Sequence, residues 1–229
     1  NKMGTDSEQL YRRLMDAEVE FNSDEYGVLI NTIIIEECIN PIGKLTEMSE
    51  SGDYKVTMAL AFILQESIGI EFRQRHVHEL RLIIRKTMAR NYFRANFTLS
   101  EVIFWLPFEE QDYLNYLQLI QSKESLLQNK AIENLCYLSA KQIKILANFS
   151  KEYDFSLFTG YGLIGPFTKT WFLNQVQGKS LIYKKIILAA LYKRGLKKSE
   201  LYEMSGSSDP DIFEFVFMFL PEVSLLNRH

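Results

Sequence analysis

The sequence predicts an all-α protein, and three observations support this fold class. Apolar residues recur at the 3.6-residue spacing of an amphipathic helix in several long segments. Three segments carry the S/T-x-x-E/Q pattern of a capping box, which starts helices. No Asn-Gly or Asp-Gly pair lies between alternating apolar residues, as a β-hairpin would favour. We therefore expect a compact multi-helix domain of about ten helices.

The composition is that of a protein with a sizeable core. Of its 229 residues, 47% are hydrophobic, and 16 Phe and 12 Tyr are among them. This apolar content excludes a mainly disordered chain. The Gly-bearing stretch 154–165 is the best internal boundary. We expect a helical domain over 1–153 and a C-terminal helical subdomain over 154–229, either separable or continuous with the first.

The first third of the chain contains three expected helices. The capping box that begins at Thr5 predicts a helix to about Phe21. A second helix is expected from Asp24 to Asn40, although the isoleucines in 26–35 fit a buried strand equally well. Residues 41–52 are expected to form a loop. Asp53 then starts a helix over 54–67, with a strand over 54–64 as the alternative.

The middle third begins with the clearest amphipathic pattern of the chain, Glu71 to about Asn96. The box beginning at Thr98 predicts a short helix that ends before Pro107. Pro107 suits the first turn of the following helix. A third box, from Ser139 to Gln142, predicts another helix start.

The C-terminal third resembles a helix-turn-helix in outline. We expect helices over Pro166–Gln177, Ser180–Arg194, Lys197–Met204 and Pro210–Leu220, with Gly195 ending the second. A DNA-reading helix presents Arg, Lys, Asn or Gln to base edges. The last helix offers acidic and phenylalanine side chains instead, so it is interpreted as core or as a partner surface.

Charge is unevenly distributed along the chain. Residues 1–69 carry a net charge of −8 and residues 70–229 a net charge of +5. The segment 71–94 alone carries a net charge of +5, because it contains seven Lys and Arg residues and only two acidic residues, Glu71 and Glu79. Such asymmetry indicates internal neutralisation or a partner that contacts one face.

The basic helix 71–94 supplies the candidate binding residues. At 100° per residue its apolar side chains gather on one face and a basic group gathers on the other. We predict a partner-binding face made of Arg75, His78, Arg81, Arg85 and Lys86. The alternative is that the acidic residues of 1–69 neutralise this face within the fold.

Arg73 and His78 form an Arg-x4-His spacing. This spacing resembles the motif of HEPN ribonucleases, which are small all-helical proteins. The resemblance implies RNA cleavage at a dimer interface, with His78 as general acid or base and Arg73 stabilising the transferred phosphate.

Other motifs give no site. Gly160–Gly165 matches the G-x-G-x-x-G pattern of dinucleotide sites, yet no acidic residue lies between Asp154 and Glu200 and no βα alternation is present. We interpret it as a tight turn between helices. No cofactor is expected.

Histidines and cysteines also give no site. His76 and His78 diverge on a helix, so they cannot share a metal ion, and His229 is the only other histidine. Cys38 and Cys136 are interpreted as buried free thiols. We predict neither a metal site nor catalytic residues.

These observations give a ranked set of functions. The first is a non-enzymatic regulatory or adaptor protein that binds a protein or polyanion through the basic face. The alternative is a nucleic-acid-associated regulator that uses the same face, and the second alternative is a HEPN-like ribonuclease. No segment approaches the roughly 20 apolar residues of a membrane span. We expect a cytoplasmic protein without a membrane partner, and a homodimer is one option for its assembly.

Overall fold

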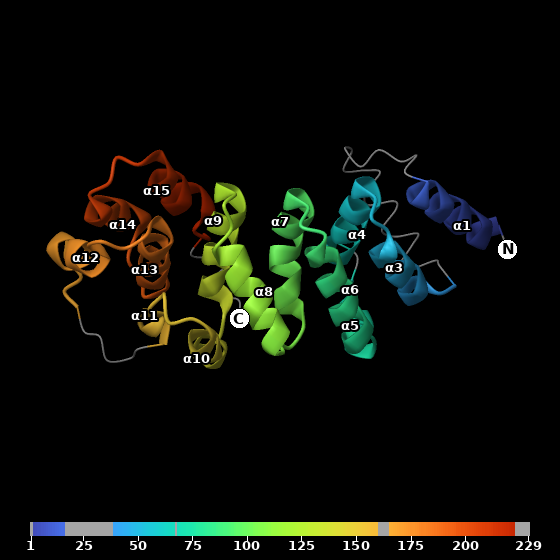
Figure 1. The fold of residues 1–229 in the computed structure, drawn as a ribbon, viewed down its shortest axis with the longest axis horizontal. Helices are drawn as coiled ribbons and strands as arrows, with labels where there is room; N and C mark the ends of the chain where they lie inside the picture. The colour runs from blue at the N-terminus through green and yellow to red at the C-terminus, as the bar shows by residue number, and fades with distance from the viewer. Residues whose placement is uncertain (1, 17–38, 67, 160–164, 223–229) are drawn as a thin grey trace. The chain divides into compact units, whose positions relative to one another are not determined.

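All of the secondary structure in the described part of the chain is helical, which confirms the predicted fold class. The computed structural model describes residues 2–16, 39–66, 68–159 and 165–222 (Figure 1). These residues form 14 α-helices together with short 3₁₀ and π-helical turns, and they contain no strand. The competition between helix and strand over 54–64 is resolved in favour of helix. The segment 26–35 lies outside the described residues.

The chain divides into two compact units, Asn1–Phe108 and Glu109–His229. The expected C-terminal subdomain 154–229 therefore lies inside the second unit. The helical elements of the first unit are α1 (Lys2–Met15), α3 (Pro41–Glu50), α4 (Tyr54–Glu66), α5 (Ile70–Arg75), α6 (Val77–Ala89), α7 (Phe93–Val102) and the 3₁₀ turn η2 (Ile103–Trp105).

The core of the first unit is built around α4. Leu60, Ile63 and Leu64 on this helix are fully buried. α4 packs against α1, α3, α6 and α7, which are the other helices of ten or more residues in the described part of this unit. Burial of its apolar side chains is the main source of stability here, since each buried aliphatic side chain contributes about 1.5–3 kcal/mol.

The second unit has more and shorter helices. They are α8 (Glu110–Ile120), α9 (Ser125–Asn134), the 3₁₀ turn η3 (Leu135–Tyr137), α10 (Ala140–Phe149), α11 (Ser156–Thr159), α12 (Lys169–Val176), α13 (Leu181–Lys193), α14 (Lys198–Ser205), α15 (Pro210–Glu214) and the π-helical turn η4 (Phe215–Phe219).

α13 is the central helix of the second unit. Its residues from Ile186 to Tyr192 are all buried. It packs against α9, α11, α14 and η3. The Tyr192 hydroxyl also donates to the carbonyl of Pro221, so the end of the described chain is bonded to this helix.

Several helix ends lie where the sequence predicts them. Ser139 and Gln142 form the expected capping box of α10. The Ser180 hydroxyl accepts the Tyr183 N–H at 3.2 Å and caps α13. Gly195 follows the end of α13 with a φ of +107°, a value that glycine adopts without strain.

The expected loop 41–52 is wrong, because α3 occupies most of it. The Asn40 side chain accepts the Gly43 N–H at 3.1 Å and Pro41 takes the first helical position. Proline is favoured there, since its missing N–H would have no helical partner. Leu45 and Met48 are fully buried, so tertiary packing stabilises a helix that the Pro-Ile-Gly sequence does not predict.

The prediction of one helix from Glu71 to Asn96 is also wrong. His76 leaves the helical region (φ −122°, ψ 31°) and separates α5 from α6. Its ring packs on that of Phe72, with centroids 4.7 Å apart. Asn91 then ends α6 with a φ of +57°, which asparagine tolerates better than other non-glycine residues. Periodicity alone does not reveal either break.

Two further helix starts were misplaced in the middle of the chain. Thr98 does not start a helix, because α7 already runs through it and the Ser100 hydroxyl donates to the Phe97 carbonyl inside the helix. Pro107 precedes α8, which Glu109 and Asp112 cap reciprocally.

The remaining differences concern the ends of helices. α1 has begun by Lys2, ahead of the box at Thr5, and α12 begins at Lys169 rather than Pro166. The last predicted helix is α15 followed by the π-helical turn η4. Residues 24–38 of the expected helix 24–40, with Cys38, and most of the Gly160–Gly165 motif fall outside the described ranges, while residues 39–40 are not helical.

Gly206→Ala should destabilise the protein by roughly 1–2 kcal/mol. Gly206 ends α14 with a φ of +57°, and an added Cβ would lie 2.8 Å from Cε of Lys169. Gly52→Ala is the matched control, because Gly52 has no positive φ and an added Cβ would lie 3.6 Å from the flexible Nη1 of Arg90, an ordinary contact distance. Urea unfolding measures both; equal losses in the two variants would contradict the left-handed cap.

Candidate functional site

The predicted binding residues lie on α5 and α6 of the first unit. His78 and Lys86 are exposed and lie in one helical row, at positions i and i+8. Leu82 lies between them at i+4, with 45% of its side chain exposed. Arg81 and Arg85 form a half-buried second row beside this ridge. The sequence prediction missed Leu82, although its i±4 relation to His78 and Lys86 could have indicated it.

Two of the predicted cations pair with carboxylates of the same unit. Lys86 binds Glu50 of α3, which belongs to the acidic N-terminal third. Arg75 binds Glu71 one turn earlier in α5. Both pairs are largely exposed, and exposed ion pairs contribute little to stability. The acidic segment thus neutralises one cation of the predicted face.

Arg73 and His78 are not joined by a hydrogen bond or an ion pair. The guanidinium of Arg73 lies 4.8 Å from the ring centroid of Trp105, and its Nε is buried without a hydrogen-bond partner. His78 is exposed in the first turn of α6, beyond the break at His76. The ribonuclease activity implied by the Arg-x4-His spacing stays a prediction.

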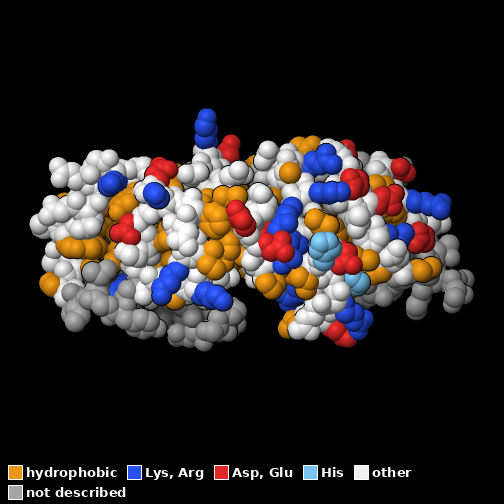
Figure 2. All heavy atoms as spheres, turned by 60° about the horizontal axis from the view of Figure 1, so that its bottom comes forward, with side chains coloured by type: hydrophobic (Ala, Val, Ile, Leu, Met, Phe, Trp, Pro, Cys, Tyr) orange, Lys and Arg blue, Asp and Glu red, His pale blue; other side chains and the backbone are white. Residues whose placement is uncertain are grey.

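The surface around α5 and α6 carries charges of both signs. Figure 2 shows histidine side chains beside basic, acidic and apolar ones. Glu79 lies 3.9 Å from Nδ1 of His76. Arg81 donates from Nη2 to the carbonyl of Pro107 at 2.8 Å, which fixes its position beside the ridge. The predicted basic face is therefore a mixed-charge surface with an apolar residue in its centre.

The second unit holds a buried polar network. Lys185 of α13 is fully buried, and its Nζ lies 2.9 Å from Oδ2 of Asp211 and 2.8 Å from Oε1 of Gln128. Oδ1 of Asp211 accepts the Ser125 hydroxyl at 2.7 Å and the Asn129 side-chain amide at 3.4 Å. One ammonium and one carboxylate thus join α9, α13 and α15.

Burial and pairing act against each other in this network. Burial lowers the pKa of Lys185, while the hydrogen bond and the charge of Asp211 oppose that shift. Burial would raise the pKa of Asp211, but hydrogen bonds from Lys185 and Ser125 outweigh it, and the pKa lies below its usual value. The lowered pKa keeps the Asp211 carboxylate charged near neutral pH. The network has the character of a structural ion pair.

In the helix-turn-helix arrangement expected over 180–220, α15 and η4 occupy the position of a DNA-recognition helix, but they contribute to the core. Ile212, Phe215 and Val216 of α15 and η4 are buried. Phe213 and Met218 are exposed, and the Phe213 ring packs against its neighbours in the aromatic cluster of α14, α15 and η4. This helix presents apolar side chains at its surface.

Cys136 is the one cysteine within the described ranges. It is buried, and its Sγ lies 3.6 Å from the carbonyl of Ala189. Burial raises the pKa of this thiol to about 12. A protonated, enclosed thiol is unreactive. Among the described residues, no group of three or more His, Cys, Asp or Glu is arranged to hold a metal ion.

Comparison with protein-family models, with curated proteins and with solved structures found no match to this chain. Within the ranges that the structure describes, every helix is too short or too polar to cross a membrane.

Asp211→Asn should destabilise the second unit by about 3 kcal/mol at pH 7, because it leaves the buried Lys185 ammonium unpaired. The effect depends on pH. Since folding lowers the pKa of Asp211, its contribution is present above the unfolded value of about 3.9 and is lost as pH falls below it.

Urea unfolding of the wild type and the Asp211→Asn variant from pH 7 to pH 3 measures this contribution. We expect the difference between their free energies of unfolding to shrink as the pH drops below about 4. A difference that stays constant over this range would show that the Asp211 charge does not stabilise the fold.

Proposed function

We propose that the chain is a non-enzymatic helical adaptor or regulatory protein that binds an acidic protein partner through one surface of its first unit. We call it the α5–α6 surface. It consists of Arg75, His78, Arg81, Leu82, Arg85 and Lys86.

The observation that carries the proposal is the exposed ridge of α6. Leu82 lies between His78 and Lys86, and it has 45% of its side chain exposed. Ile70, at the start of α5, has 67% exposed. Arginine with exposed apolar residues is typical of protein interfaces, in which an apolar centre is surrounded by a polar rim.

The charges around the ridge favour a protein over a nucleic acid. Glu50 and Glu71 pair with Lys86 and Arg75, so they reduce the net positive charge of the surface. Nucleic-acid interfaces are much more strongly positive. An acidic protein segment can place its carboxylates on the arginines of α5 and α6 and its apolar residues on Leu82, which gives both attraction and specificity.

Leu82→Glu should weaken capture of the partner at least about tenfold, because it places a charge in the centre of the interface. Leu173→Glu on α12 is the matched control, since Leu173 has 43% of its side chain exposed against 45% for Leu82. The measurement is quantitative mass spectrometry of proteins captured from native cell extract by the immobilised wild type and both variants.

The capture is carried out with and without nuclease. Proteins that resist nuclease, bind the wild type and Leu173→Glu, and are lost from Leu82→Glu would support the proposal. Equal capture by Leu82→Glu would contradict it. Capture that nuclease abolishes would favour the nucleic-acid-associated regulator, whose binding would also weaken steeply with salt.

A further inference from the structure

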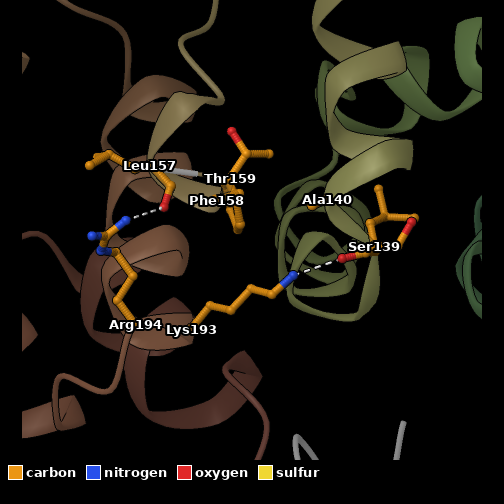
Figure 3. Close-up of a pocket in the computed structure, with 8 residues that line it drawn as sticks. Ser139, Ala140, Leu157, Phe158, Thr159, Lys193 and Arg194 are labelled. Atoms are coloured by element: carbon orange, nitrogen blue, oxygen red, sulfur yellow. Dashed lines mark hydrogen bonds between the residues drawn. The ribbon is translucent and has the colours of Figure 1, made fainter. Parts of the chain in front are cut away.

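The second unit contains a cavity of about 500 Å³ at one end of α13. Its walls come from the start of α10, from α11 and from the last turn of α13 (Figure 3). Leu157 and Phe158 of α11 form an apolar wall, and Ala140 of α10 lies across from them. The Thr159 side chain lies at the same cavity. Sites for small organic molecules have volumes of about 300–1,000 Å³ and mainly apolar walls.

Lys193 is the charged group at this cavity. Its side chain extends from α13 toward the start of α10, where Nζ donates to the Leu138 carbonyl at 2.7 Å (Figure 3). An ammonium has three N–H donors, and a carbonyl oxygen uses only one of them. The ring centroid of Phe158 lies 6.0 Å from Nζ. Burial lowers the pKa of Lys193, as expected for a charge in a partly apolar site.

The half-buried Lys193 differs from the fully buried Lys185 of α13 in its anionic partners. Lys185 lies 2.9 Å from the Asp211 carboxylate. No carboxylate of the described residues lies within 4.0 Å of Lys193. A partly buried cation without a counter-charge is costly, and buried charges are normally paired.

Arg194 gives the cavity a rigid side. Its Nη1 donates to the Leu157 carbonyl at 3.1 Å, and its guanidinium carbon lies 5.6 Å from the ring centroid of Phe167. These contacts fix the apolar wall of α11 relative to the end of α13. The guanidinium of Arg194 is also a second positive charge near Lys193, and it strengthens the attraction of an anion to the cavity.

We propose that this cavity binds a small organic anion, with its carboxylate or phosphate group paired to Lys193 and its apolar body against Leu157 and Phe158. The anion would supply the counter-charge that no described carboxylate provides to Lys193. The site lies in the second unit and does not depend on the α5–α6 surface, so either proposal can fail without the other.

The probes are 2-naphthoate and 2-naphthyl phosphate, with the neutral 2-naphthamide as the matched control compound. Isothermal titration calorimetry and ligand-detected NMR measure binding to the full chain. For a ligand of this size we expect a dissociation constant of about 1 mM or lower. At least one of the two anions should bind, and the amide should bind at least about tenfold more weakly, since a charge-assisted hydrogen bond is lost.

Three variants separate this site from general attraction to a basic protein. Lys193→Met removes the charge and keeps the apolar stem, so affinity should fall at least about tenfold. Ala140→Trp fills the cavity and leaves Lys193 in place, so it should also abolish binding. Ala140 is exposed at the first position of α10, where a larger side chain is compatible with folding. Lys184→Met removes a neighbouring charge on α13 and should leave affinity unchanged.

Thermal unfolding shows first which variants are folded, and Ala140→Trp carries the test if Lys193→Met is not. Binding of an anion that Ala140→Trp abolishes and Lys184→Met preserves would support the site. Anion binding that persists in Ala140→Trp, or that Lys184→Met reduces as much as Lys193→Met does, would overturn it. Absence of binding by both anions, or equal binding of the amide, would overturn it as well.

Discussion

The packing of the second unit depends on the pairing of the buried Lys185 ammonium with the Asp211 carboxylate. α13 is the helix around which the unit packs, and Lys185 is fully buried on it, among aliphatic side chains. The Asp211 carboxylate and the Gln128 amide oxygen are positioned to solvate that ammonium. The placement of α9 and α15 against α13 is therefore constrained by hydrogen-bond geometry as well as by apolar packing. An apolar core alone tolerates many side-chain arrangements, whereas an ion pair of this kind can favour one.

The sequence predicted the fold class and the helix ends whose signals are local. Ser139 and Ser180 accept backbone N–H groups three residues ahead, so the interaction is contained in the residues that predict it. The start of α3 was not predicted, because Asn40 and Pro41 are also typical of a turn. The burial of the helix's apolar side chains, which distinguishes the two, is a tertiary property. The break at His76 accompanies a ring contact with Phe72, and hydropathy encodes neither of them.

The sequence predicted the candidate binding surface only in part, because some of its contacts involve residues far apart in the sequence. Helical spacing gives the direction of each side chain, and His78 and Lys86 are indeed exposed. It does not give the contacts of those side chains with distant segments. Glu50, which pairs with Lys86, lies 36 residues away in the sequence. Nor did the charge pattern draw attention to Leu82, because an apolar residue in a basic segment is ordinarily assigned to the core.

The bond between Tyr192 and Pro221 has a consequence for synthesis of the chain. α13 contacts segments that follow it, and Asp211 lies 26 residues after Lys185. At translation rates of about 5–20 residues per second, about 1–5 seconds separate the two residues as they are polymerised. During this interval the most apolar helix of the unit lacks both its counter-charge and one of its packing surfaces. The ion pair in the core of the second unit can therefore form only after α15 has been synthesised.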